Sequence, residues 1–91
     1  MVITLSGEFD VESELDVELI LEVASSAESV EVHLADVTFA DSTLLNLLLR
    51  MADRFEVRLV GPLQRQPARL MELTGVLERF AVRGRGEERP R

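Results

Sequence analysis

Three carboxylates and a pair of adjacent hydroxyls are the side chains whose types and spacing could carry chemistry in this chain. The carboxylates are those of Asp10, Asp36 and Asp41, and Ser42 and Thr43 follow the last of them directly. Carboxylates gathered at one place can hold Mg²⁺ or perform acid–base catalysis, whereas an isolated Asp often only caps a turn or a helix. A hydroxyl at the start of a helix can be a cap or a site of modification.

Other kinds of chemistry lack the residues they need. The chain has no Cys and one His, His33, which excludes disulfides, thiolate ligands and cysteine nucleophiles and leaves no set of His ligands for a metal. We find no phosphate-binding loop, dinucleotide motif or nucleophile–His–Asp arrangement. We therefore predict that the protein is not an enzyme and has no catalytic residue, metal or cofactor.

The charge is divided unevenly along the chain. The 91 residues are enough for one domain and carry a net charge of −7. Residues 1–49 contain eleven acidic residues and no Lys or Arg, whereas residues 50–91 contain six acidic residues and ten Arg. The acidic half disfavours nucleic acid and anionic lipid and favours a basic protein partner. No targeting segment or membrane span is visible, so we expect a cytoplasmic protein without membrane insertion.

The positioning elements alternate between strands and helices. Periodicity and breakers predict strands over residues 2–6, 29–34, 56–60 and 80–82, and helices over 11–27, 42–55 and 67–75. The segment 11–27 also alternates as a strand would, but its length favours a helix with Asp10 as N-cap. Residues 36–40 are expected to be a loop. Helical crossovers between strands imply an α/β sandwich with a mostly parallel sheet of about four strands and its functional loops at the carboxyl ends of the strands.

Helical spacing also predicts which side chains are buried. For the first helix the predicted buried face consists of Leu15, Leu19, Ile20, Val23 and Ala27. For the second helix it consists of Leu44, Leu47, Leu48, Met51, Ala52 and Phe55. The remaining polar stripe contains Ser42 and Asn46, with Leu45 and Leu49 at its edge. This pattern indicates a docking surface with a modifiable hydroxyl at its centre.

Four segments in order resemble the STAS domains of bacterial anti-sigma-factor antagonists: SGEFD at residues 6–10, ADVTFADSTLLNLLLR at 35–50, LVGP at 59–62 and LMELTGVLERF at 70–80. The resemblance implies a STAS-like domain over residues 1–82, with helices on one side of the sheet, followed by an Arg-rich disordered tail over 83–91. It also implies partner switching, in which the unmodified antagonist binds an anti-sigma factor that is a Ser/Thr kinase. The kinase ends the interaction by phosphorylation, and a phosphatase restores it.

The resemblance assigns roles residue by residue. Ser42 matches the phosphorylated Ser, Thr43 the second hydroxyl, Asp41 the preceding acid, and Asp10 the acidic residue that ends the first loop at the partner surface. Together with the edge of the polar stripe, the predicted partner-binding residues are Asp10, Asp41, Ser42, Thr43, Leu45, Asn46 and Leu49.

Two departures from the family pattern favour an alternative, which is a non-phosphorylated STAS subunit of a lipid-transporter complex or a signalling scaffold. Leu44 stands where the family usually has Gly, so either the partner differs or phosphorylation is impaired. The strand that commonly pairs with the first strand in the family is also missing here. The open sheet edge that this leaves invites a homodimer or a partner strand.

Overall fold

The computed structural model describes residues 1–83, and within them the elements alternate as the sequence predicts. The strands are β1 (Val2–Phe9), β2 (Ser29–Ala40), β3 (Glu56–Val60) and β4 (Ala81–Arg83). The helices are α1 (Glu14–Val23), α2 (Ser42–Ala52) and α3 (Arg65–Thr74), with 3₁₀ turns η1 (Val11–Ser13), η2 (Ala24–Ser26) and η3 (Val76–Arg79). Arg83, the first residue of the predicted tail, is the last residue of β4. The rest of the predicted tail, residues 84–91, lies outside the described residues.

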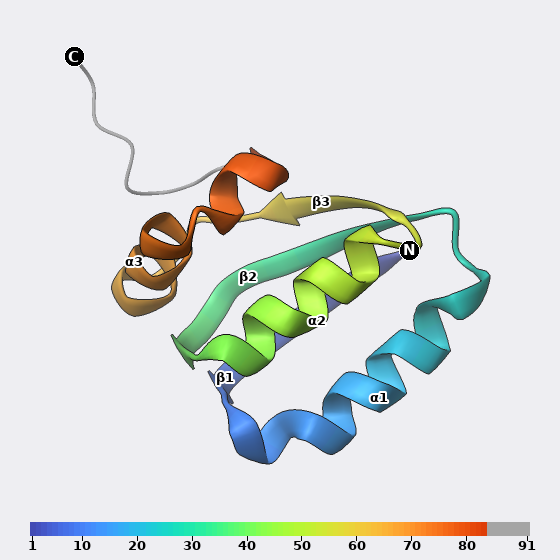
Figure 1. Cartoon of the computed structure of the whole chain (residues 1–91), viewed down its shortest axis with the longest axis horizontal. Helices are drawn as coiled ribbons and strands as arrows, with labels where there is room; N and C mark the ends of the chain where they lie inside the picture. The colour runs from blue at the N-terminus through green and yellow to red at the C-terminus, as the bar shows by residue number, and fades with distance from the viewer. Residues whose placement is uncertain (84–91) are drawn as a thin grey trace.

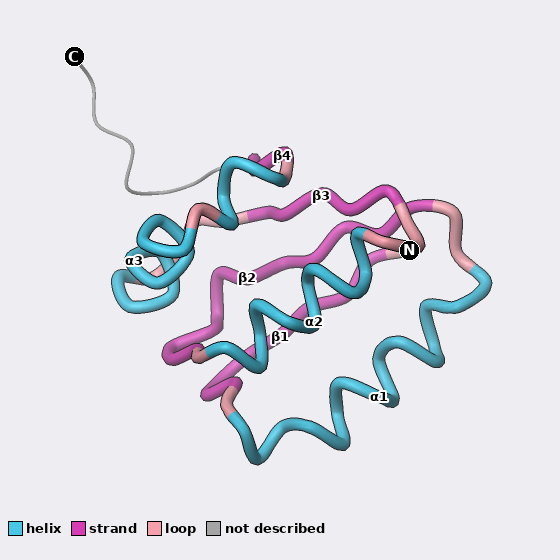
Figure 2. The backbone as a smooth tube through the Cα atoms, in the orientation of Figure 1, coloured by secondary structure: helices cyan, strands magenta, loops and turns pink. Residues whose placement is uncertain are grey.

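The sheet is fully parallel, with the spatial order β1-β2-β3-β4. Successive right-handed crossovers between neighbouring strands place the connecting helices on one face of the sheet. Figure 1 shows α2 in front of the strands with α1 beside it, and Figure 2 traces the same path in the backbone. The predicted fold class, a small α/β sandwich with a parallel sheet and helices on one side, is confirmed.

Within residues 1–83, the opposite face of the sheet is uncovered and polar. Along the strands, buried side chains such as Val32 and Leu59 alternate with the more exposed His33 and Arg58. His33 Nε2 lies 3.1 Å from Glu31 Oε1, and Arg58 Nη1 lies 3.9 Å from Glu31 Oε2. Parallel sheets are usually covered on both faces. These polar side chains explain why this sheet tolerates contact with water on one face.

The prediction for β2 was too short, because residues 36–40 continue the strand and do not form a loop. The pairing with β1 shifts register twice, so that β2 contains extra residues relative to its neighbour. The buried side chains Leu34, Val37 and Ala40 are consequently three residues apart. Bulges of this kind break the period of two by which a strand is recognised. β1 is also longer than predicted, because it continues through Gly7 at a φ of 77° to Phe9.

The predicted buried face of α1 was wrong for three of its five residues, whereas Ile20 and Ala27 are half-buried and pack against the core. Leu15, Leu19 and Val23 are 85%, 58% and 57% exposed, whereas the buried side chains on and just after this helix are Val17, Leu21 and Ala24. Apolar residues lie on both sides of the helix, so periodicity fits two rotations about its axis. The helix is also shorter than expected, since its first and last turns are η1 and η2 and its N-cap residue is Ser13, not Asp10.

The other helices agree more closely with prediction. α2 buries Leu44, Leu47, Leu48 and Met51 as expected, followed by Phe55, although Ala52 is exposed. α3 begins two residues before Pro67, whose missing N–H is harmless in the first turn. Gly75 ends α3 in the left-handed conformation, as predicted.

Candidate functional site

Two of the three candidate carboxylates meet at the carboxyl ends of neighbouring strands. Phe9 of β1 pairs with Ala40 of β2, and the Asp41 N–H donates to the Phe9 carbonyl at 3.3 Å, so Asp10 and Asp41 are neighbours. Asp36 does not join them, because it pairs with Ser6 within the sheet, about 16 Å upstream along β2 at the usual rise per residue. In the described residues no three His, Asp or Glu side chains gather in a way that could hold a metal ion.

Asp10 and Asp41 play the same local role. Asp10 Oδ1 accepts from the Glu12 N–H at 3.0 Å, and Asp41 Oδ1 accepts from the Thr43 N–H at 2.8 Å. In both cases the carboxylate satisfies a backbone donor two residues ahead, at the start of a helical segment. The N-cap of α2 is therefore Asp41 and not Ser42.

Because Asp41 is the N-cap, the side chain of Ser42 does not cap the helix. Ser42 is the first residue of α2, its side chain is exposed, and within residues 1–83 its hydroxyl makes no hydrogen bond. Thr43 is half-buried and contributes its N–H to the cap. Of the two hydroxyl residues, Ser42 is the more accessible to a partner or to a modifying enzyme.

A groove of about 640 Å³ between α1 and α2 opens beside Ser42. From α2 it is lined by Ser42, Thr43, Asn46 and Arg50, and from α1 by Leu15, Val17 and Glu18. Arg50 Nη1 lies 3.1 Å from Glu18 Oε2, and this ion pair bridges the two helices. The sequence did not predict that α1 contributes to this groove. Leu15 was expected to be buried, and no sequence pattern pairs Glu18 with Arg50, which lie 32 positions apart.

The predicted apolar contacts lie on the other flank of Ser42. At about 100° per residue, Asn46 and Leu49 share the outward side of α2 with Ser42, and Leu45 lies at its border. Asn46 is exposed, and Leu45 and Leu49 are half-buried, with Leu45 packed against the core. The surface around Ser42 is thus mixed, with polar groups in the groove and partly exposed leucines beside it.

Leu44 does not lie on this surface. Its side chain is fully buried in the core cluster under α2. The side chain that replaces the usual Gly therefore points into the core and away from the surface around Ser42.

Two glutamines that the sequence did not single out bond to the C-terminal part of β2, which leads into α2. Gln66 accepts from the Ala40 N–H at 2.8 Å and donates to the Ala40 carbonyl at 2.7 Å, and Gln64 donates to the Ala35 carbonyl at 2.9 Å. β3 pairs with residues 29–33 of β2, and in the part of the chain that the structure describes no strand lies beside β2 beyond them on that side. The glutamine amides supply hydrogen bonds there that a strand would otherwise provide.

The fold and this site define a class, which is a one-sided α/β module that presents an exposed hydroxyl at a helix N-terminus. A family model described as "Mlab, STAS domain" matches residues 1–82, and the chain belongs to the STAS family. Members of this family mediate protein–protein interactions and are generally non-catalytic. No curated protein and no solved structure matches the chain. Among the described residues, none of the helices has the length and apolar character needed to cross a bilayer.

Proposed function

We propose that this protein is a cytoplasmic anti-sigma-factor antagonist that binds an anti-sigma factor with Ser/Thr kinase activity and is released when that kinase phosphorylates Ser42. The observation that carries the proposal is the position of Ser42. Its hydroxyl is exposed at the first turn of α2, while Asp41 performs the capping. Thr43 is the alternative acceptor, and a phosphatase would restore the unmodified form.

The electrostatics of the site support release on phosphorylation. A phosphate carries nearly two negative charges, which the N-terminus of a helix tolerates, so the fold is preserved. The same charge would lie near Asp10 and Asp41 in an interface from which water is excluded. Burying it there is costly unless a partner Arg or Lys neutralises it. The partner surface consists of Asp10, Asp41, Ser42, Thr43, Leu45, Asn46 and Leu49.

A second candidate is a non-phosphorylated STAS subunit of a larger complex, such as a lipid transporter or a signalling scaffold. It is favoured by the description of the matching family, which names Mlab and not an anti-sigma-factor antagonist. In this case the surface around Ser42 would be a constitutive contact with the hydroxyl as part of it.

Peptide mapping of the protein purified from its own organism separates the two candidates. There is no Lys or Arg before Arg50, so trypsin leaves residues 1–50 as one long peptide. Cleavage before Asp instead isolates residues 41–52, which contain Ser42 and Thr43 as the sole hydroxyls. A phosphate on Ser42 that disappears in Ser42→Ala but persists in Thr43→Ala supports partner switching. An unmodified peptide under every growth condition contradicts it and favours the constitutive subunit.

Variants of Ser42 test how the switch works. We expect Ser42→Ala to bind the partner kinase normally and Ser42→Asp to bind at least about tenfold more weakly, because the new carboxylate is desolvated beside two others. Calorimetric titration measures the affinity, and an unchanged melting temperature shows that folding is intact. Ser6→Asp adds the same charge on the open face of the sheet and serves as the control. Loss of binding in Ser42→Ala would instead make the hydroxyl a direct contact.

A further inference from the structure

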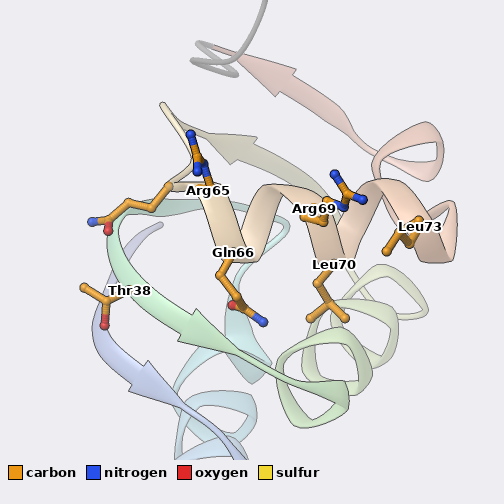
Figure 3. A pocket seen from close by; sticks show the side chains of 7 residues that line it. Thr38, Arg65, Gln66, Arg69, Leu70 and Leu73 are labelled. Carbon is orange, nitrogen blue, oxygen red and sulfur yellow. The ribbon is translucent and has the colours of Figure 1, made fainter.

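The outer side of α3 carries a groove whose lining shares no residue with the groove beside Ser42. It has a volume of about 930 Å³ and lies between α3 and the C-terminal part of β2, with Thr38 on the strand side. Figure 3 shows Gln66 and Leu70 projecting from one side of α3, and Arg65 and Arg69 from the neighbouring side. The groove therefore combines two leucines, Leu70 and Leu73, with the cations of Arg65 and Arg69.

The charges of this groove have no partner within the molecule as described. Arg65 and Arg69 are exposed and form no ion pair with any residue in 1–83. Leu73, which follows them along the same side of the helix, is 74% exposed. A large exposed leucine next to unpaired guanidinium groups fits an acidic segment that also carries apolar side chains.

The outer side of α1 has this complementary character. Leu15, Leu19 and Val23, four residues apart, form an exposed apolar row that we call the α1 stripe. Asp16 and Glu22 are exposed on either side of it. The row is long enough to span two turns of the helix, and its flanking charges are opposite in sign to those of the α3 groove.

The α1 stripe and the α3 groove of one molecule do not meet. α2 lies between α1 and α3 (Figure 1), and α1 packs against α2. A symmetric contact between two α1 stripes would bring acids together, and one between two α3 grooves would bring arginines together. Only the pairing of one stripe with one groove matches both the apolar rows and the charges.

We propose that the α1 stripe of one copy docks into the α3 groove of a second copy. Such a contact uses two different surfaces, so it is head-to-tail, and each bound copy presents one free stripe and one free groove for the next. The stripe shares Leu15 with the groove beside Ser42, but Leu19 and Leu73 do not line that groove. Variants at Leu19 and Leu73 therefore test this contact separately from phosphorylation of Ser42. The contact is also distinct from pairing through the open edge of β1.

Complementary variants test the head-to-tail contact by sedimentation velocity of the full chain. Leu19→Glu disables the stripe and Leu73→Glu disables the groove, and both side chains are exposed, so neither variant disturbs the core. Val2→Glu adds the same charge at an apolar site on the sheet that is 62% exposed, and it is the matched control. Loading concentrations should run from micromolar to near-millimolar.

We expect the average molecular mass of the species in solution to rise with concentration for the wild type and for Val2→Glu. Leu19→Glu and Leu73→Glu should each associate at least about tenfold more weakly. An equimolar mixture of Leu19→Glu and Leu73→Glu should form a 1:1 dimer that grows no further, because each variant retains the surface the other lacks. A wild type that stays monomeric throughout would overturn the proposal and leave the α3 groove to an acidic segment of another protein. Association that survives in both single variants, or a mixture that stays monomeric, would also overturn it.

Discussion

The first turn of α2 depends on a single carboxylate. Asp41 Oδ1 accepts the Thr43 N–H at 2.8 Å and satisfies one of the free donors at the helix start. We expect Asp41→Ala to lower the free energy of unfolding by about 0.5–2 kcal/mol, and Asp41→Asn to retain most of it. Urea unfolding followed by circular dichroism measures the difference. Asp53→Ala, at the C-terminal end of the same helix, is the control and should be neutral or slightly stabilising.

Gln66 should matter more for stability than its position on the surface of α3 suggests. Replacing it by Leu removes the hydrogen bonds to both the N–H and the carbonyl of Ala40. We expect Gln66→Leu to destabilise the protein by about 1–3 kcal/mol, since these part-buried backbone groups are left unpaired. Gln64→Leu, which removes one exposed hydrogen bond, should cost less. Equal stability of the two variants in chemical unfolding would show that water replaces the Gln66 amide.

At the scale of elements, the rotation of α1 about its axis is the feature most open to a direct check. Leu15 is exposed and Leu21 is buried on the same helix. Leu15→Ala should change the free energy of unfolding by no more than about 0.5 kcal/mol, whereas Leu21→Ala should cost about 2–5 kcal/mol. The reverse order in thermal or urea unfolding would mean that the helix presents its other face to the core.

At the scale of the whole molecule, one apolar cluster joins the two layers. It contains residues from β1, β2 and β3 and from all three α-helices, and Leu34 in β2 is fully buried within it. We expect a single unfolding transition, with equal calorimetric and van't Hoff enthalpies. Leu34→Ala should lower the stability by about 2–5 kcal/mol and keep the transition single. A separate early melting of α3, seen by hydrogen exchange, would contradict this prediction.

The local sequence pattern predicted an element correctly wherever only one packing arrangement of that element satisfied the pattern. The breaker residues and the leucine spacing of α2 predicted its start, its core face and the exposure of Ser42, because a helix with a single apolar face has one way to pack. The alternation of element types likewise predicted the parallel sheet, because consecutive parallel strands require crossovers. The placement of Asp10 beside Asp41 followed from that topology.

Tertiary structure decided two kinds of feature. In the first, the local sequence pattern allowed more than one arrangement, and in the second, the feature depends on residues that are distant in the sequence. α1 has apolar residues on two sides, and packing against α2 selected Val17 and Leu21 over Leu15 and Leu19. Two register shifts in the pairing with β1 allow β2 to continue through residues in which buried and exposed side chains do not alternate. The hydrogen bonds of Gln66 with Ala40 join residues 26 positions apart. The sequence alone therefore determined the order of elements, the core of α2 and the candidate hydroxyl, while the outward face of α1 and the support of the site arose only when the chain packed together.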